Sequence, residues 1–512
     1  MTRAPSTRAL HRPLAASPDR LDRRTASPRV VAALILLGCG LSASSARAGG
    51  FTVTTFGTRR GGMQAVIGCP DDLSAVFHNP AGLADQPDRQ VYAFFAPTFV
   101  SHSFRVKALD PQRYPEINPS GCGEPGAAPC PWPIDGEGYY AAKISPERYF
   151  GLLPYLAAST DLGFLGRRGK DVVVALALYS PNLYGAEMPE SAPTAYMIVG
   201  GVFLSIAPTL AVGWRVNRYL ALGGALSYNY LTLSMSQKLS FADALTPQGS
   251  RPEGLAVLAQ QLLGDLRMDF SGVDHGVGWN LSALVSPWPW LSIGLGYAGA
   301  KSATFEGNVE FKALGKNVKD QETFQRLVTS VGYKLPERLV IEMPIPHNLQ
   351  AGLHFRLGRR VELGVEARFW LYQLYDKQVL RPIYNPTAVG KEPMTEASLT
   401  RDKKYKLSYQ VSGGIDVRPF KRLPALDLLA GLGFDASPIP DETFTLDNPS
   451  NSYVKVTAGV VYRMSPRWRF SATYLLGLYL PRDVRNSQTR PPTNARGAGI
   501  THSPALDVTA RF

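Results

Sequence analysis

Apolar and polar residues alternate along much of the chain. In NLQAGLHFRL (348–357) every odd-numbered position is apolar, and the even-numbered positions carry Asn, Gln, Gly, His and Arg. The run VELGVEARFW (361–370) repeats this pattern after a short GRR, and KYKLSYQV (404–411) repeats it again. Because successive side chains of a β-strand point to opposite faces, this period of two predicts strands with one wholly apolar face.

A soluble β-sandwich also alternates, but the length of the runs and the fully charged residues on their polar faces favour a membrane barrel. The alternating runs reach ten residues or more, whereas strands of soluble proteins usually have about 5–6. A transmembrane strand needs about 9–11 residues, apolar outward and polar inward, and lipid tolerates no unpaired strand edge. The last run, ALDVTARF (505–512), ends on Phe512 and resembles the assembly signal of bacterial outer-membrane barrels.

The alternating runs number fourteen, an even count as single-chain bacterial barrels require. We therefore predict an all-β fold, a 14-stranded antiparallel transmembrane β-barrel in the outer membrane, with short periplasmic turns and longer extracellular loops. The strands are expected at 91–106, 149–160, 171–185, 197–216, 219–238, 267–286, 290–306, 344–358, 360–377, 403–419, 424–436, 453–465, 467–480 and 501–512.

Two of the longer connections, 238–268 and 308–335, place apolar residues at helical spacing. One interpretation is a helix that packs on the barrel rim, and the other is an outer groove for an apolar ligand. The candidate groove residues are Leu258, Leu262, Leu266, Phe324, Leu327 and Val331.

The first 48 residues have the order of a secretory signal. A basic leader precedes the apolar run VVAALILL (30–37), and Ala46-Arg47-Ala48 provides an A-x-A cleavage site. The apolar run is too short to span a bilayer. Arg23-Arg24 suggests a twin-arginine signal and Cys39 a lipoprotein signal, but cleavage after Ala48 is the preferred interpretation.

The charge and the cysteine content bear on nucleic-acid binding, disulfide formation and metal binding. Removing 1–48 takes away eight basic and two acidic residues, so the net charge falls from +13 to +7, and no basic stripe for nucleic acid remains. Cys122 and Cys130 lie in a Gly/Pro-rich loop and are candidates for a disulfide in an oxidising compartment, which leaves Cys69 free. Their spacing matches no common metal site.

Residues 49–90 do not alternate cleanly, yet they are too apolar for a solvated tail. They contain CPDDLSAVFHNPAGLAD (69–85), in which Asn79-Pro80-Ala81-Gly82 is a turn sequence. We predict that this segment is a hatch domain that plugs the barrel formed by 91–512.

Several segments together resemble the outer-membrane long-chain fatty-acid transporter family, the FadL/TodX type. Gly50-Phe51 at the mature start, Asp71-Asp72 and then Asn79-Pro80-Ala81 follow the order that the family shows. Further similarity runs through 207–231, 290–308, 345–353 and 434–481, and so over nearly the whole mature chain.

The resemblance implies a mechanism. Ligand would enter an outer groove, pass to an interior pocket near the chain's N-terminus, and leave sideways through a gap made by a kink in the third strand. Asn79, Pro80 and Ala81 would be part of the hatch that plugs the barrel. Pro181 is the kink candidate, although this chain has SPNLYG where many members have Pro-Phe-Gly. Among the inward-facing cations, Arg356 and Arg368 are the candidates for binding a ligand carboxylate. The alternative is structural pairing with Glu362, Glu366, Asp416 or Asp507.

We therefore expect passive uptake of hydrophobic compounds, with long-chain fatty acids as the ligand. Aromatic or alkane hydrocarbons, a polar-solute porin and a structural barrel without transport are alternatives. No enzyme activity, cofactor or metal is expected, since the sequence contains neither a G-x-S-x-G elbow nor metal-ligand spacing. Expected partners are the hydrophobic small-molecule ligand, outer-membrane lipid and lipopolysaccharide, and the barrel-assembly machinery acting on the C-terminal strand. The protein should be a monomer.

Overall fold

The computed structural model describes residues 53–119, 121–147, 150–246, 250–315, 318, 321–330, 332–392, 394–395 and 399–512. The predicted signal peptide, the first four hatch residues and Val331 lie outside this part of the chain, as does the side chain of Leu327.

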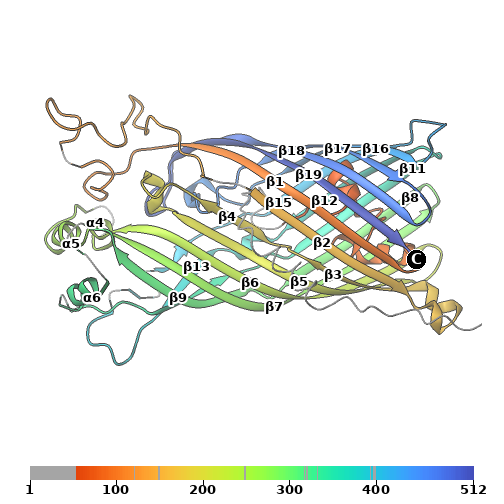
Figure 1. The fold of residues 1–512 in the computed structure, drawn as a ribbon, viewed down its shortest axis with the longest axis horizontal. Helices are drawn as coiled ribbons and strands as arrows, with labels where there is room; N and C mark the ends of the chain where they lie inside the picture. Colours follow the sequence, from red (N-terminus) through yellow and green to blue (C-terminus); the bar gives the residue numbers. More distant parts are fainter. Residues whose placement is uncertain are drawn as a thin grey trace, which may run out of the picture. The chain divides into compact units, whose positions relative to one another are not determined.

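The strands form one closed antiparallel barrel (Figure 1). Their bounds are β1 Gln90–Val106, β2 Phe150–Asp161, β3 Val172–Tyr179, β4 Leu183–Glu187, β5 Gly200–Arg215, β6 Leu220–Ser240, β7 Asp265–Trp288, β8 Leu291–Ala300, β9 Ala303–Ala313, β10 Arg338–Met343, β11 Asn348–Leu357, β12 Val361–Trp370, β13 Lys377–Ile383, β14 Arg401–Asp402, β15 Ser408–Val417, β16 Leu426–Asp435, β17 Tyr453–Arg463, β18 Trp468–Val484 and β19 Ala495–Arg511.

Five wall strands are each interrupted once, so nineteen segments make fourteen barrel strands. The interrupted pairs are β3 with β4, β8 with β9, β10 with β11, β12 with β13, and β14 with β15, and both members of a pair bond to the same neighbouring wall strand. Pairing of β1 with β19, from Gln90↔Arg511 to Val106↔Ala495, closes the wall. The prediction of a 14-stranded antiparallel barrel is confirmed.

The alternation has the orientation that a bilayer demands. Apolar side chains of the wall face outward, as Val91, Phe95 and Phe99 of β1 show with 47–50% of their surface exposed. Polar side chains face the lumen, where Gln410 and Lys455 are fully buried. A soluble protein has the opposite arrangement, and so this pattern identifies the outer surface as the one that meets lipid.

The helices lie in the hatch and in the connections. They are α2 Thr58–Met63, α3 Ala75–His78, η1 Pro80–Asp85, η2 Gly163–Leu165, η3 Arg167–Asp171, η4 Pro193–Tyr196, α4 Phe241–Ala244, α5 Leu255–Leu263, α6 Gln321–Ser330, η5 Tyr372–Leu374 and η7 Asp441–Thr443. In Figure 1, α4, α5 and α6 lie at the end of the barrel away from the C-terminus. No helix in the described ranges has the length and apolar character needed to cross a membrane.

The helical stripe predicted in 238–268 is shorter than expected. Helix α5 ends at Leu263, and Gly264 follows with a φ of 67°, a left-handed conformation that glycine adopts readily. Leu266 therefore lies on strand β7 and not on the helix.

Candidate functional site

The hatch fills the lumen near the C-terminal end of the barrel (Figure 1). Most of its side chains from Val53 to Ala84 are buried, including those of α2, whose six residues contact β15, β16, β17 and β18. Helix η1 contacts the opposite part of the wall, on β5, β6 and β7. The hatch is thus wedged between two sides of the barrel and is not a free tail.

The Asn-Pro-Ala-Gly sequence is a structural corner of this hatch. Asn79 precedes η1, and its side chain accepts a hydrogen bond from the Ala81 N–H at 3.2 Å and donates one to the Ile67 carbonyl at 2.8 Å. Pro80 occupies the first helical position, where its missing N–H costs nothing. A Cβ on Gly82 would lie 2.0 Å from Cγ of Pro70, so only glycine fits there.

Glycines of the wall let the hatch backbone approach closely. A Cβ on Gly223 of β6 would lie 2.1 Å from the Ala81 nitrogen, and one on Gly294 of β8 would lie 1.9 Å from the Ile67 carbonyl oxygen. Ordinary contact begins at about 3.4 Å. The hatch and the wall therefore fit at the level of single missing methyl groups.

Buried ion pairs fix the hatch to the wall as well. Arg60 of α2 contacts Oε1 of Glu366 at 2.5 Å, and the backbone N–H groups of Val66 and Ile67 donate to Oε2 of the same carboxylate at 2.6 and 3.0 Å. Arg368, a candidate for carboxylate binding, also contacts Glu366 at 3.2 Å. Its guanidinium therefore already has an anionic partner.

His78 completes this network. Nδ1 of His78 lies 3.0 Å from an NH2 group of Arg368, and Nε2 lies 2.7 Å from the Phe56 carbonyl. Burial, and then the nearby Arg368 charge, hold the pKa of His78 well below its usual value. The ring is therefore neutral when the hatch is seated.

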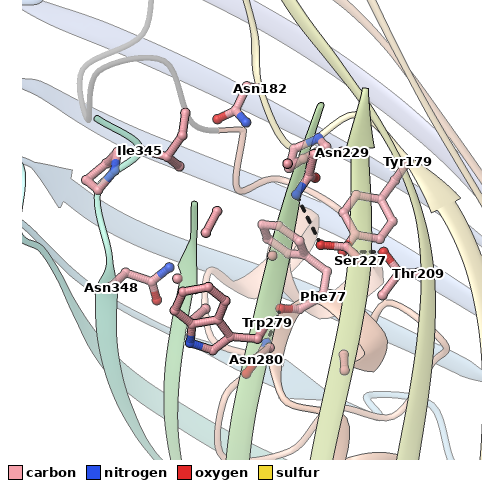
Figure 2. Close-up of a pocket in the computed structure, with 18 of the residues that line it drawn as sticks. Phe77, Tyr179, Asn182, Thr209, Ser227, Asn229, Trp279, Asn280, Ile345 and Asn348 are labelled. Atoms are coloured by element: carbon pink, nitrogen blue, oxygen red, sulfur yellow. Dashed lines mark hydrogen bonds between the residues drawn. The ribbon is translucent and has the colours of Figure 1, made fainter. Parts of the chain in front are cut away.

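A partly open cavity of about 110 Å³ lies beside the hatch and is lined by residues of β3, β5, β6, β7, β8, β11 and β12. Figure 2 shows its aromatic side chains, among them Phe77, whose ring centroid lies 5.4 Å from that of Tyr179. Several amides also line it: Asn182, Asn229, Asn280, Asn348 and Gln350.

Three polar atoms of lining residues are buried without a hydrogen-bond partner among the described residues. They are the Oδ1 atoms of Asn280 and Asn348 and the Nε1 atom of Trp370. Such orphans are costly in a folded protein and suggest a missing partner. Sequence reasoning did not select these residues, although asparagine is uncommon in strands and its recurrence at inward positions is a usable signal.

The wall is broken next to this cavity. β3 pairs with β5 up to Tyr179↔Ala207 and β4 resumes at Leu183↔Leu204, so the third wall strand has one residue more than its neighbour over this stretch. On the other side, β2 pairs with β3 only as far as Tyr155↔Tyr179. No strand pairing joins residues 150–154 to β4 in the described part of the chain.

Pro181, the predicted kink residue, lies in this break between β3 and β4. Its carbonyl accepts a hydrogen bond of 2.8 Å from the Val53 N–H, which ties the start of the described hatch to the broken strand. Asn182 is held on the β5 side by Ser205, whose Oγ accepts from the Asn182 N–H at 2.9 Å. Tyr179, Pro181 and Asn182 all line the cavity, and so the cavity reaches the break.

The other predicted site residues lie elsewhere. Arg356 is exposed at the turn end of β11, in a hollow of about 590 Å³ with Arg215, Arg218 and Trp288, far along the strand from the cavity. Cys122 and Cys130 are joined by a disulfide, and Cys69 is a free cysteine in the hatch.

The outer-groove candidates separate into two groups. Leu258 and Leu262 of α5 are exposed, whereas Leu266 and Phe324 are buried in the core. A hollow of about 980 Å³ lies beside α6 and is lined by Gln325, Val328 and Thr329 of that helix, but not by Phe324, the candidate whose side chain the structure describes there.

Comparison with known proteins places this geometry in a family. The family model for outer membrane protein transport proteins (OMPP1/FadL/TodX) matches residues 39–478. A curated outer membrane protein of Neisseria meningitidis serogroup B is 24% identical over 246 residues, which are 46% of this chain and 49% of that protein. The chain thus spans about half the length of the curated relative that it matches.

Two solved structures share the fold. A FadL homologue of Pseudomonas aeruginosa aligns with a TM-score of 0.70 and 16% identity, over 90% of this chain and 100% of that one. The toluene transporter TodX of Pseudomonas putida aligns with a TM-score of 0.60 and 15% identity, over 90% and 99% of the two chains. Together with the family match over most of the sequence, the closed barrel shows that this chain is a multi-pass β-barrel of the outer membrane and belongs to the OMPP1/FadL/TodX family of transport proteins.

Proposed function

We propose that the protein takes up long-chain fatty acids across the outer membrane by passive diffusion, with lateral exit through the break between β3 and β4. The observation that carries this proposal is that one cavity touches the hatch, through Phe77, and the broken strand, through Pro181 and Asn182. A ligand in this cavity is therefore separated from the lipid-facing surface by the broken part of the wall.

The lumen below the cavity supports a sideways route. It is filled by the hatch, with the buried charges of Arg60, Glu366 and Arg368 across it. An acyl chain gains about 0.8 kcal/mol for each CH₂ removed from water, and passage between ion pairs would offer no such gain. The hydrocarbon layer outside the wall does offer it.

The unpartnered polar atoms favour a ligand with a polar head. The Trp370 indole N–H can donate to a carboxyl oxygen, and the Oδ1 atoms of Asn280 and Asn348 can accept from a protonated carboxyl group or an ordered water. A pure hydrocarbon would leave all three unpaired, at about 1–3 kcal/mol each. This difference supports a fatty acid over an alkane.

A monoaromatic hydrocarbon is the second candidate. The cavity of about 110 Å³ is smaller than the ~150 Å³ that accommodates benzene in an apolar cavity, so a compact ligand needs the smaller rearrangement. The similar structure TodX is a toluene transporter. A fatty acid needs more room, which the side chains of Phe77 and Trp279 would have to release.

Ligand binding separates these candidates. We would measure displacement of a fluorescent C16–C18 fatty acid from detergent-folded protein, and compare Trp370→Phe with Trp290→Phe as the control. Trp290 is half-exposed at the turn before β8 and stacks on Trp288. Saturable binding that weakens about 5- to 150-fold only in Trp370→Phe supports the proposal. Toluene binding without fatty-acid binding would favour the second candidate, and binding of neither would favour a structural barrel.

The exit route has its own test. Deletion of Pro181 removes the extra residue of the third wall strand relative to β5, so β3 and β4 can form one continuous strand. The variant should still bind fatty acid, but whole-cell uptake should fall to the level of cells without the protein. Uptake at the wild-type rate by a folded deletion variant would exclude this break as the exit.

A further inference from the structure

One cluster of ligating side chains lies apart from the cavity and takes no part in the proposed transport. Cys69 comes from the hatch, between α2 and α3, and His354 and Glu362 come from the adjacent wall strands β11 and β12. One sulfur, nitrogen or oxygen atom from each of the three lies within 4.8 Å of the others. The sequence places the wall pair 285 or more positions after the cysteine.

The backbone holds the three residues in place. His354 and Glu362 face the lumen from paired strands, and Nε2 of His354 lies 3.1 Å from Oε2 of Glu362. The hatch backbone is pressed against the same strand, because a Cβ on Gly68 would lie 3.0 Å from the His354 nitrogen. The close packing of Gly68 against β11 therefore places the adjacent Cys69 beside the wall.

The donor set is that of zinc. Thiolate, imidazole and carboxylate are the groups that bind Zn²⁺, at about 2.0–2.3 Å from the metal, and a tetrahedral site then separates its ligand atoms by about 3.3–3.8 Å. Nε2 of His354 and Oε2 of Glu362 lie 3.1 Å apart, slightly closer than this spacing, and one ligand atom from each of the three residues lies within 4.8 Å of the others. Side-chain movements of about 1 Å would therefore bring the three atoms to tetrahedral spacing. Cys69 is half-buried, and with three protein ligands the fourth position of a zinc site is ordinarily taken by water.

The other ring nitrogen of His354 is also buried. His354 is 98% buried, and its Nδ1 atom has no hydrogen-bond partner within the described ranges. A buried imidazole with an unused nitrogen is costly unless a ligand or a neighbour engages it.

Two guanidinium groups already contact Glu362, that of Arg59 and that of Arg418, which lies 3.6 Å from Oε1. Arg59 contacts Oε2 of Glu362 at 2.5 Å and competes for that oxygen, but it also contacts Asp71 at 3.1 Å and Asp416 at 3.8 Å. The guanidinium thus keeps two carboxylates when Glu362 turns one oxygen to a metal ion.

We propose that Cys69, His354 and Glu362 bind a zinc-type divalent cation that joins the hatch to the barrel wall. Because one ligand comes from the hatch and two come from the wall, the ion stabilises the plugged state and not the barrel alone. The site is independent of the ligand that the barrel carries.

Metal titration of the mature protein, purified in detergent and stripped with a chelator, tests this proposal. Zn²⁺ should bind with one equivalent against a chromophoric competitor, and Co²⁺ should give the thiolate-to-metal absorption of a tetrahedral site. Cys69→Ser and His354→Gln should each weaken Zn²⁺ binding at least tenfold, and Cys69→Ser should abolish the cobalt–thiolate band. His502→Gln, which removes a histidine hydrogen-bonded to Tyr474, is the matched control and should bind like wild type.

Heat-modifiable migration in gels would show that each variant is folded. A measurement on the wild type needs no variant: Zn²⁺ should slow maleimide labelling of Cys69. Absence of stoichiometric Zn²⁺ binding to wild type, or unchanged affinity in folded Cys69→Ser and His354→Gln, would overturn the proposal. So would unchanged labelling of Cys69 at saturating Zn²⁺.

Discussion

The fit between hatch and wall predicts opposite outcomes for two neighbouring alanine substitutions on β6. Gly223 faces the hatch, and its added Cβ would lie 2.1 Å from the nitrogen of Ala81. Gly224 faces away, and the nearest atom to its added Cβ is Cδ2 of Leu281 at 3.7 Å. Gly223→Ala and Gly224→Ala change strand propensity equally, so the difference between them isolates the contact with the hatch.

The size of the effect follows from the geometry. Ordinary contact begins at about 3.4 Å, so Gly223→Ala must move η1 or β6 by at least 1.3 Å, the difference between 3.4 and 2.1 Å. The contacted atoms belong to the backbone of Pro80 and Ala81 and cannot rotate away. Overpacking of this kind costs about 1–3 kcal/mol, which corresponds to an increase of about 5- to 150-fold in the population of molecules whose hatch is displaced. Gly224→Ala needs no movement.

Cys69 provides the assay, because it is the free cysteine that the structure describes in the hatch. We expect maleimide labelling of Cys69, in the presence of a chelator, to be about 5- to 150-fold faster in Gly223→Ala than in wild type. Gly224→Ala should label at the wild-type rate. Ion conductance in planar bilayers should likewise be higher in Gly223→Ala than in wild type and unchanged in Gly224→Ala. Equal labelling and conductance of two folded variants would refute the claim that wall glycines seat the hatch.

Three further predictions concern the hatch and an outer loop. Asn79→Ala removes the bond to the Ile67 carbonyl and the cap of η1, and should weaken hatch seating by about 1–3 kcal/mol in the Cys69 labelling assay. The pKa of His78 is held well below 6.5 in the seated hatch and returns to about 6.5 when the hatch is released. The hatch should therefore be fully seated above pH 6.5, and seating should weaken as the pH falls below 6.5. Conductance should therefore rise on acidification, with a smaller rise in His78→Gln. Cys122→Ser with Cys130→Ser opens a loop of eight positions, worth about 2.5 kcal/mol, and should speed proteolysis of 107–147 without changing heat-modifiable migration of the barrel.

The hatch residues show why motif and role can differ. Asn79-Pro80-Ala81 was visible as a turn, and its likeness to the family placed it in a plug, but its contacts to Ile67 and to the wall are set by packing. Arg368 was visible as an inward cation, yet the sequence could not show that Glu366 and His78 already engage it. A charge pattern predicts which face of a strand a charged residue lies on, but not the residue with which it pairs across the lumen.

The chain's own period of two determined the barrel. Alternation is a local property, and parity assigns each strand residue to lipid or lumen without knowledge of its neighbours. An alternating run could therefore be predicted for each of the fourteen wall strands, although β10 and nearly all of β13 lie outside the predicted ranges. Helix ends were less certain, because Leu266 fits a helical stripe and a strand equally well until Gly264 breaks the helix.

Tertiary structure alone decided the geometry of the sites. The break beside Pro181 depends on a one-residue difference in register between two strands, and no single strand records its register. The cavity exists because the hatch leaves part of the lumen unfilled next to Phe77. Cys69, His354 and Glu362 meet only because strands far apart in the chain close into a cylinder around the segment that precedes them. The period of apolar residues can be read along the chain, whereas residues on opposite sides of the lumen come close only after the barrel closes.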